Sequence, residues 1–349
     1  MSMKRYCAAA VSFAGLLMIA TGSARAQQMP AHRGASGKIQ LDVAVTTSKG
    51  APVGALTEQD FTVLDNKKPH PIASFAAVKG GKDAPVEVLI VLDSVNTPYT
   101  YLGYQRDQVA KYLRSNGGAL PYPTTFAVLT DTSFDMNKVA TRDGNALANT
   151  LEHTNIGLRV ITRSQGFWGA ADRMTVSLNG LRSLTLAEGK KPGRKLVLWV
   201  SPGWPLLSGP EVELDSSQEE DVYQNAITFS RELRKADITL YSVNSWGATE
   251  NMNREFFYEG FLDGLKGPGD AEWGNLALQV LAAQSGGLVL SSNDLIGMMK
   301  QCVDDANQYY RIVLNAPHDE KPNTYHRIEV KVAQRDVEAR TRAGYYSQP

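Results

Sequence analysis

The run Val86-Glu87-Val88-Leu89-Ile90-Val91-Leu92 decides the fold, because six of its seven residues are apolar. A strand with one face in water alternates apolar and polar residues. A strand in the middle of a parallel sheet is covered by helices on both faces and is apolar throughout. We therefore expect residues 86–92 to form a central strand of a parallel sheet.

Short apolar runs alternate with helical stripes from this strand to about residue 308. Further runs occupy residues 126–129, 195–200, 238–243 and 288–290. Between the runs, apolar residues recur every three or four positions, which is the spacing of one helix face. These stripes are Leu102, Val109, Ala110 and Leu113; Ala171, Met174, Leu178 and Leu181; Val222, Tyr223, Ala226 and Leu233; Trp273, Leu276, Ala277, Val280 and Leu281; and Leu295, Met298, Met299, Cys302 and Val303. Ser216 with Glu219 matches a capping box, and Asn293 is expected to cap the last helix. The pattern predicts βαβ crossovers, and therefore a doubly wound, mainly parallel α/β domain over residues 84–308.

The segments on either side of this domain have the two-residue period of half-buried strands. The alternating positions are Ile39, Leu41, Val43 and Val45 near the N-terminus, and Tyr310, Ile312, Leu314, Ile328, Val330 and Val332 near the C-terminus. Each segment alone is too small to be stable. We therefore predict that residues 38–78 and 309–346 pair into one discontinuous, β-sandwich-like module, with the α/β domain inserted between them.

The first 26 residues have the organisation of a secretory signal peptide. Lys4 and Arg5 precede a fifteen-residue, mostly apolar run, and Ala24-Arg25-Ala26 matches a cleavage signal. The alternative is a membrane anchor, but this run is short for a bilayer and no second long apolar run follows. We expect cleavage after Ala26, no transmembrane segment in the mature chain, and a periplasmic or secreted protein. Only Cys302 then remains, and we expect it to be buried without a disulfide.

The composition is that of an ordinary globular protein and argues against nucleic acid as a partner. Apolar residues make up 43% of the 349 residues and charged residues 21%, which excludes collagen, coiled coil and disorder. Lys+Arg and Asp+Glu are equal at 36 each, and removal of the signal peptide takes away three basic residues and no acidic one. A mildly acidic protein lacks the positive surface that phosphate backbones require.

Three stretches together resemble a known family. They are residues 50–75 with the core Leu56-Thr57-Glu58-Gln59-Asp60-Phe61; Leu92-Asp93-Ser94-Val95-Asn96-Thr97; and residues 309–346, from Tyr309-Tyr310 through His326-Arg327-Ile328 to Gly344-Tyr345-Tyr346. They are similar to the bacterial secreted family related to von Willebrand factor type A (VWA) domains. The resemblance covers nearly the whole mature chain and implies a Rossmann-like α/β sheet of the type A kind.

The resemblance also implies a divalent metal site, but one that has degenerated. In type A domains, D-x-S-x-S follows the first strand, a later loop supplies Thr, and Asp follows the fourth strand. Here Asp93 matches and Thr97 replaces Ser, whereas Val95 cannot ligate a metal. Ser201 stands where the family has Asp, and Thr162 aligns only loosely with the Thr. The implied site at Asp93, Thr97 and Ser201 would hold no ion or a weakly bound Mg²⁺ or Ca²⁺. The alternative is that Asp93 caps the turn that follows it.

Aromatic residues concentrate in the loops that follow the predicted strands. Ligands of parallel sheets bind beyond the carboxyl ends of the strands, and exposed aromatic side chains are frequent binding hot spots. The insertion 247–272 is long enough to suggest a functional loop, although it can equally pack as a satellite core. The candidate partner-binding residues are Asn96, Phe167, Trp168, Trp204, Trp246, Phe257 and Tyr258.

These observations favour an exported type A binding module that recognises a protein or peptide partner in the cell envelope through the top face of the α/β domain. The five histidines are dispersed, and H-E-x-x-H, C-x-x-C and G-x-S-x-G motifs are absent from the sequence. The main alternative is a metal-dependent or hydrolytic enzyme with its site under the aromatic insertion 247–272. A purely structural component of the envelope is a third possibility.

Overall fold

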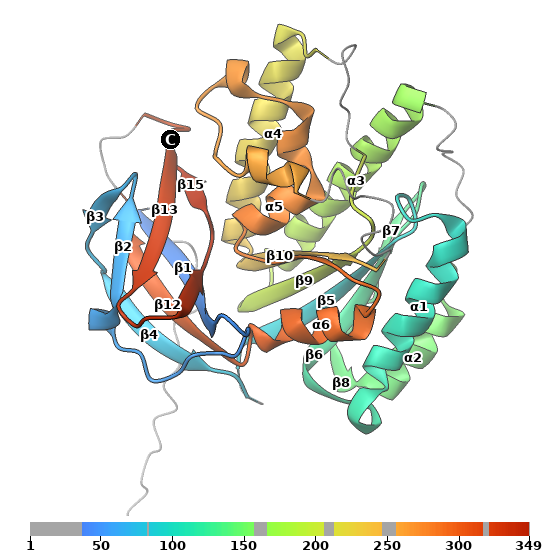
Figure 1. Ribbon diagram of the computed structural model, residues 1–349. Coiled ribbons are helices and arrows are strands. Elements are labelled where there is room, and N and C mark those ends of the chain that lie inside the picture. The colour runs from blue at the N-terminus through green and yellow to red at the C-terminus, as the bar shows by residue number, and fades with distance from the viewer. Residues whose placement is uncertain are drawn as a thin grey trace, which may run out of the picture. The chain divides into compact units, whose positions relative to one another are not determined.

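Residues 86–93 form the strand from which the central sheet is built. The computed structural model describes residues 37–81, 84–156, 166–205, 213–245, 256–316 and 321–348. In it, β5 (Val86–Asp93) pairs in parallel with β6 (Ala119–Leu129) on one side and with β9 (Arg194–Val200) on the other. The strand order is β11-β10-β9-β5-β6-β7 (Figure 1). The predicted mainly parallel α/β sheet is confirmed.

The two ends of this sheet differ in strand direction. On the β9 side, β10 (Ile238–Asn244) and β11 (Val289–Ser291) continue the parallel pairing. On the β6 side, β7 (Phe134–Met136) and β8 (Thr141–Asp143) both pair antiparallel with β6.

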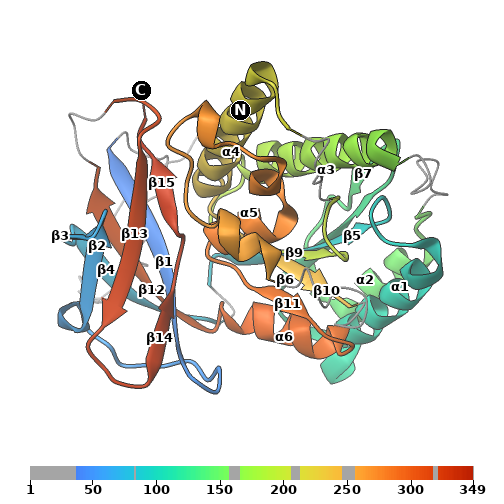
Figure 2. The same cartoon turned by 45° about the horizontal axis from the view of Figure 1, so that its top comes forward.

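Helices cover both faces of the sheet, as Figures 1 and 2 show. One core contains Leu89 and Val91 together with α3 (Gly166–Glu188), α4 (Ser216–Lys235) and α5 (Leu278–Gln284). The other core contains the alternate β5 residues Val88, Ile90 and Leu92 together with α1 (Tyr99–Leu113), α2 (Gly144–His153) and α6 (Leu295–Asp304). Because both faces of β5 are covered, the strand is apolar throughout.

Strands from both ends of the described chain form two antiparallel sheets, of order β14-β1-β12-β4 and β15-β13-β2-β3. Their alternating apolar residues share a third core that holds Ile39 and Ile328. Within it, the rings of Phe61, Phe75 and Tyr310 lie with centroids 5.0 to 5.8 Å apart. We call these eight strands the β module. They are β1 (Lys38–Thr47), β2 (Phe61–Asp65), β3 (Lys68–His70), β4 (Ser74–Lys79), β12 (Gln308–Asn315), β13 (Tyr325–Val332), β14 (Val337–Arg340) and β15 (Gly344–Tyr346). The 3-10 turns are η1 (Glu58–Asp60), η2 (Ser115–Gly118), η5 (Phe257–Phe261), η6 (Pro268–Asp270) and η7 (Trp273–Leu276).

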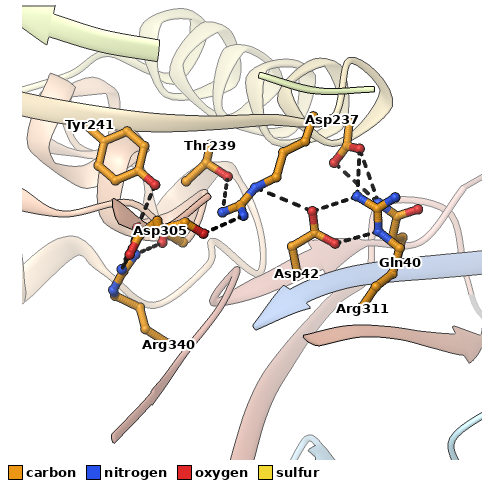
Figure 3. A network of polar contacts seen from close by, with 10 residues as sticks. Gln40, Asp42, Asp237, Thr239, Tyr241, Asp305, Arg311 and Arg340 are labelled. Carbon is orange, nitrogen blue, oxygen red and sulfur yellow. Dashed lines mark hydrogen bonds and ion pairs between the residues drawn. The ribbon is translucent and has the colours of Figure 1, made fainter. Parts of the chain in front are cut away.

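Polar contacts join the β module to the start of β10 (Figure 3). Arg311 of β12 donates two hydrogen bonds, of 2.8 and 2.9 Å, to the carboxylate of Asp42 on β1. The same guanidinium lies 3.2 Å from Asp237, which also accepts from the Gln40 amide at 3.3 Å. Removing one partner of the buried Arg311–Asp42 pair costs about 3–5 kcal/mol, whereas the side chain of Asp237 is 30% exposed. These contacts therefore hold β1 and β12 firmly against the amino end of β10.

A second cluster of polar side chains lies beside the first in Figure 3 and is centred on Asp305, which follows α6. Its carboxylate accepts from Arg340 of β14 at 2.6 and 2.7 Å and from the Tyr241 hydroxyl at 2.6 Å. Arg194 donates to the backbone carbonyl of Asp305 at 3.0 Å and lies 3.5 Å from Asp42. Arg194 thus joins the two clusters of polar side chains into one network.

One stretch of the α/β region, between residues 130 and 165, holds three elements that the sequence pattern does not predict. They are β7, β8 and α2. Asp143 begins α2 by accepting a hydrogen bond from the Ala146 amide at 2.9 Å. The apolar stripe of α2 has only three members, Leu147, Ala148 and Leu151, so it was too short to stand out.

The predicted helix caps are displaced by one residue. The capping box expected at Ser216 and Glu219 is formed instead by Asp215 and Gln218. The last helix is capped by Asp294, which accepts from the Gly297 amide at 2.8 Å, and not by the asparagine before it. In both places two good cap residues are adjacent, and the aspartate is the one whose side chain accepts from the first turn of the helix.

Cys302 is buried and free, as predicted. No helix in the described ranges combines the length and apolar character needed to cross a membrane. The predicted signal peptide (residues 1–26), Thr162 and Trp246 lie outside the described residues.

Candidate functional site

The carboxyl ends of β5 and β9 form the switch point of the central sheet. The chain passes from β5 to β6 on one side and later returns to β9 on the other. In doubly wound sheets, ligands bind outside the carboxyl ends of the strands at such a point. Buried polar residues gather here; they are Asp93, Ser94, Asn96, Thr97, Ser201, Asn244 and Ser245. This edge of the sheet is therefore the candidate site.

Asp93, the last residue of β5, is fully buried and accepts three N–H groups. Its Oδ1 accepts from the backbone N–H of Asn96 at 2.9 Å. Its Oδ2 accepts from Asn96 Nδ2 at 2.8 Å and from the indole Nε1 of Trp199 at 2.9 Å. Burial raises the pKa of Asp93, while these hydrogen bonds favour the carboxylate and act in the opposite direction. The side chain thus ties the turn after β5 to the neighbouring strand.

The pairing of β5 with β9 brings Trp199 to Asp93. Trp199 lies opposite Val91 in the parallel register. Val91 and Asp93 are two residues apart and point to the same face of the sheet, so the indole extends along that face to the carboxylate. Sequence reasoning missed this residue, because it treated 195–200 only as a buried strand. The available signal was that a buried tryptophan N–H needs an acceptor.

The residues expected to hold a metal do not fit a divalent ion. Mg²⁺ and Ca²⁺ require several oxygen ligands with free lone pairs. Three N–H groups already occupy three of the roughly four acceptor sites of the Asp93 carboxylate, and Ser201 Oγ accepts from the Gly203 amide at 3.1 Å. Thr97 Oγ1 is buried and has no hydrogen-bond partner among the described residues. Across those residues, no group of three His, Cys, Asp or Glu side chains is arranged to hold a metal. We therefore derive no role for a metal.

Asn96 links the turn after β5 to α3. Its side chain is only 3% exposed, and its Nδ2 donates to Ser177 Oγ at 2.8 Å in addition to Asp93. Ser177 in turn donates to the carbonyl of Arg173, one helical turn earlier. Asn96 was expected to contact a partner. Its burial instead makes it a support of the turn and of α3.

The aromatic residues predicted for a binding face separate into exposed and buried ones. Phe167 and Trp168, in the first turn of α3, are 42% and 76% exposed, and their rings meet edge to face at 5.5 Å. Trp204 is only 4% exposed and packs edge-on against Trp199 at 5.3 Å. Trp204 therefore belongs to the core and is not available to a partner at the surface, contrary to the expectation.

Phe257 and Tyr258 are half-buried in η5, and their rings meet edge to face. The described part of the insertion packs against the body of the protein. The Leu265 amide donates to the hydroxyl of Tyr346 at 2.9 Å, and Gln284 Nε2 lies 3.3 Å from the carbonyl of Phe261. Residues 256–272 thus form a packed layer beside α5 and β15.

Three exposed tyrosines at the start of α1 were not singled out from the sequence. Tyr99, Tyr101 and Tyr104 are 64%, 38% and 42% exposed. Because α1 begins directly after the turn at Asn96, its first turn lies at the carboxyl edge of the sheet. The aromatic spacing was overlooked because helix faces were sought only in aliphatic residues. We use the name aromatic rim for these three tyrosines together with Phe167 and Trp168 at the start of α3.

Comparisons with known proteins leave the function open. No family model matches the chain, and no curated protein matches it. Among solved structures, the chain is similar to the human COPII-coat protein Sec24c, with a TM-score of 0.33 and 7% identity, over 84% of this chain and 50% of that one. The chain thus spans about half the length of that protein. A likeness of this size supports no argument about function.

Proposed function

We propose that this protein is an exported, VWA-related binding module that recognises a protein or peptide partner of the cell envelope through the carboxyl edge of its central sheet. Recognition uses the aromatic rim and needs no metal ion. The periplasmic or secreted location rests on the sequence of residues 1–26 alone.

The exposure of the aromatic rim is the observation that supports this proposal most directly. Burying apolar surface is favourable by roughly 25 cal/mol per Å² of accessible area removed from water, so exposed aromatic side chains suggest surfaces that a partner covers. The rim combines Trp168, exposed to 76%, with tyrosines that are 38% to 64% exposed. Tryptophan and tyrosine are the residue types enriched in binding hot spots.

Two further features support the proposal. With the short strand β8 left out, the strands of the α/β region follow the order 3-2-1-4-5-6 of doubly wound folds, whose ligands bind at the carboxyl edge, except that the third strand, β7, is antiparallel. The floor of that edge, around Asp93 and Asn96, is rigidly hydrogen-bonded. A rigid floor lowers the entropy lost when a partner binds at the rim.

The proposal can be tested by photo-crosslinking in the cells that produce the protein. A photoreactive amino acid placed at Trp168 should give a discrete crosslinked product. The matched control is Leu186, which is 57% exposed near the other end of α3. A probe at Leu186 should give no such product.

The affinity of the purified partner then measures the contribution of the rim. We expect Trp168→Ala to weaken binding at least tenfold, in line with a hot-spot loss of about 2 kcal/mol, and Leu186→Ala to leave it unchanged. Addition of EDTA should not alter the affinity. Equal affinities for the two variants, or crosslinking at both positions alike, would exclude the rim as the recognition surface.

A further inference from the structure

The strand β4 is an open edge of the β module. It stands at the end of the sheet β14-β1-β12-β4, and among the described residues it pairs with β12 alone. An edge strand presents a row of N–H and C=O groups that its own sheet leaves unpaired, and such a row is a template for a further strand. Natural proteins often protect edges with prolines or with several charged side chains. Ser74–Lys79 contains no proline, and its one charge is that of the last residue.

Two backbone hydrogen bonds show which groups of β4 face away from β12. The N–H of Gly80, one residue after β4, donates to the carbonyl of Asn307 at 2.7 Å. At the other end of β12, the Ala316 N–H donates to the Gly37 carbonyl, so the even-numbered residues of β12 face β1 and the odd-numbered ones face β4. Along an antiparallel strand, residues whose backbone groups face one neighbour alternate with residues whose groups face the other side. The residues of β4 that face the open edge are therefore Phe75, Ala77 and Lys79.

The edge is both held in place and accessible. The ring of Phe75 packs into the core of the β module, with centroids 5.4 Å from Phe61 and 5.8 Å from Tyr310. The two residues that follow, Ala76 and Ala77, are exposed. Because their side chains are single methyl groups, another backbone can approach to the distance of about 4.8 Å that strand pairing requires.

We propose that two copies of this chain pair through β4, antiparallel and about a two-fold axis at Ala77. In this register Ala77 lies opposite Ala77 of the other copy, and Phe75 lies opposite Lys79 of the other copy. All three outward-facing residues of each strand are then hydrogen-bonded across the axis. Other symmetric registers leave some of these groups unpaired, because the three residues lie evenly about Ala77. The interface is isologous and closes with two copies.

The side chains of β4 suit a second copy as the occupant of this edge. The axis brings two methyl groups together, and each lysine meets a phenylalanine ring, so no like charges stand opposite each other. On the other face of the strand, Ala76 lies opposite Val78 of the other copy. The two four-stranded sheets become one sheet of eight strands, in which the edge at β4 is covered.

The strand pairing is small, which sets the expected strength. Each copy contributes the six residues of β4, whereas a standard interface has about 20–30 residues a side. The dimer should therefore dissociate on dilution. It is independent of the aromatic rim, which belongs to α1 and α3.

Cysteine variants test the register directly. In a chain without residues 1–26, the native Cys302 is buried, so an engineered surface cysteine is the accessible thiol. Ala77→Cys places two thiols on the axis, with Cα atoms about 5.5 Å apart, within reach of a disulfide. The matched control is Ala76→Cys at the adjacent exposed alanine, whose two Cα atoms would lie about 8 Å apart, too far for a disulfide. Oxidised glutathione should convert Ala77→Cys into a covalent dimer and leave Ala76→Cys monomeric.

Sedimentation velocity measures the association without a crosslink. From about 1 μM to 1 mM the wild type should pass from monomer to dimer. Ala77→Lys should raise Kd about fivefold or more, because it sets two ammonium groups opposite each other. Thr62→Lys changes an exposed residue of β2, an inner strand of the other sheet, and should leave Kd unchanged.

Three results would overturn the proposal. They are a wild type that stays monomeric over the whole concentration range, equal crosslinking of Ala77→Cys and Ala76→Cys, and equal Kd values for Ala77→Lys and Thr62→Lys. The cysteine variants are the smaller changes and decide the question if a lysine variant folds poorly.

Discussion

Replacement of Trp199 by phenylalanine tests the most specific contact of the candidate site. The substitution keeps a large aromatic ring in the strand and deletes the indole N–H that donates to Asp93 Oδ2 at 2.9 Å. Asp93 is fully buried, so water cannot replace the lost donor without a rearrangement. The carboxylate would then depend on the two N–H groups of Asn96.

The loss should be measured against a matched variant, Trp204→Phe. The indole of Trp204 is also buried and contacts Trp199 edge-on, but its N–H has no hydrogen-bond partner among the described residues. Both variants lose similar ring volume, while only Trp199→Phe loses a hydrogen bond to a charged group, worth about 1.5–3 kcal/mol. We expect Trp199→Phe to lower the free energy of unfolding by about 2 kcal/mol more than Trp204→Phe does.

Urea unfolding followed by far-UV circular dichroism suits this comparison, because tryptophan fluorescence changes in both variants. The m values should stay equal, so that the midpoints report stability. The pH dependence gives a second measure. Burial already raises the pKa of Asp93, and such a carboxyl group loses stability for the fold as the pH rises through its folded pKa. Without the indole donor the pKa rises further, so the deficit of Trp199→Phe should grow as the pH rises above the ordinary carboxyl value of 3.8.

Equal losses in the two tryptophan variants would refute the reasoning, because they would mean that the hydrogen bond to Asp93 adds nothing beyond packing. A greater loss in Trp204→Phe would refute it as well. A deficit of Trp199→Phe that is independent of pH would show that Asp93 does not titrate in response to the indole.

Three further outcomes follow from the contacts of the molecule. Calorimetric titration with Mg²⁺, Mn²⁺ and Ca²⁺ should give no binding at Asp93, since its oxygens already accept three N–H groups. A saturable signal that Asp93→Asn abolishes would contradict this. Arg311→Gln should lower the free energy of unfolding by about 3–5 kcal/mol, because buried Asp42 loses the two hydrogen bonds from Arg311. In the same chemical denaturation experiment, Arg327→Gln, which removes an exposed guanidinium, should lower it by at most about 1 kcal/mol. Burial and the charge of Asp42 raise the pKa of Asp237. The wild type should therefore lose stability relative to Asp237→Asn as the pH rises from about 4 to 7. Parallel curves of stability against pH for the two proteins would rule this out.

Helices and strands with a strong hydrophobic period could be predicted from the amino-acid sequence. The unbroken apolar run of β5 and the alternation at Ile39 to Val45 predicted a covered strand and half-buried strands, because side-chain direction along a strand repeats every two residues. Elements with a short or polar pattern, such as α2, were missed. Their positions depend on packing against neighbours, which no local pattern encodes.

Which polar groups meet depends on how the strands and helices pack in three dimensions. Asp93 and Trp199 are 106 residues apart, and Arg311 and Asp42 are 269 apart. Each pair is brought together by strand pairing, whose register depends on all the residues of both strands at once. For the same reason the sequence pattern placed Trp204 among the candidate partner-binding residues, whereas its packing on Trp199 places it in the core. Burial is a property of the assembled layers, and a single residue's type specifies it only in part.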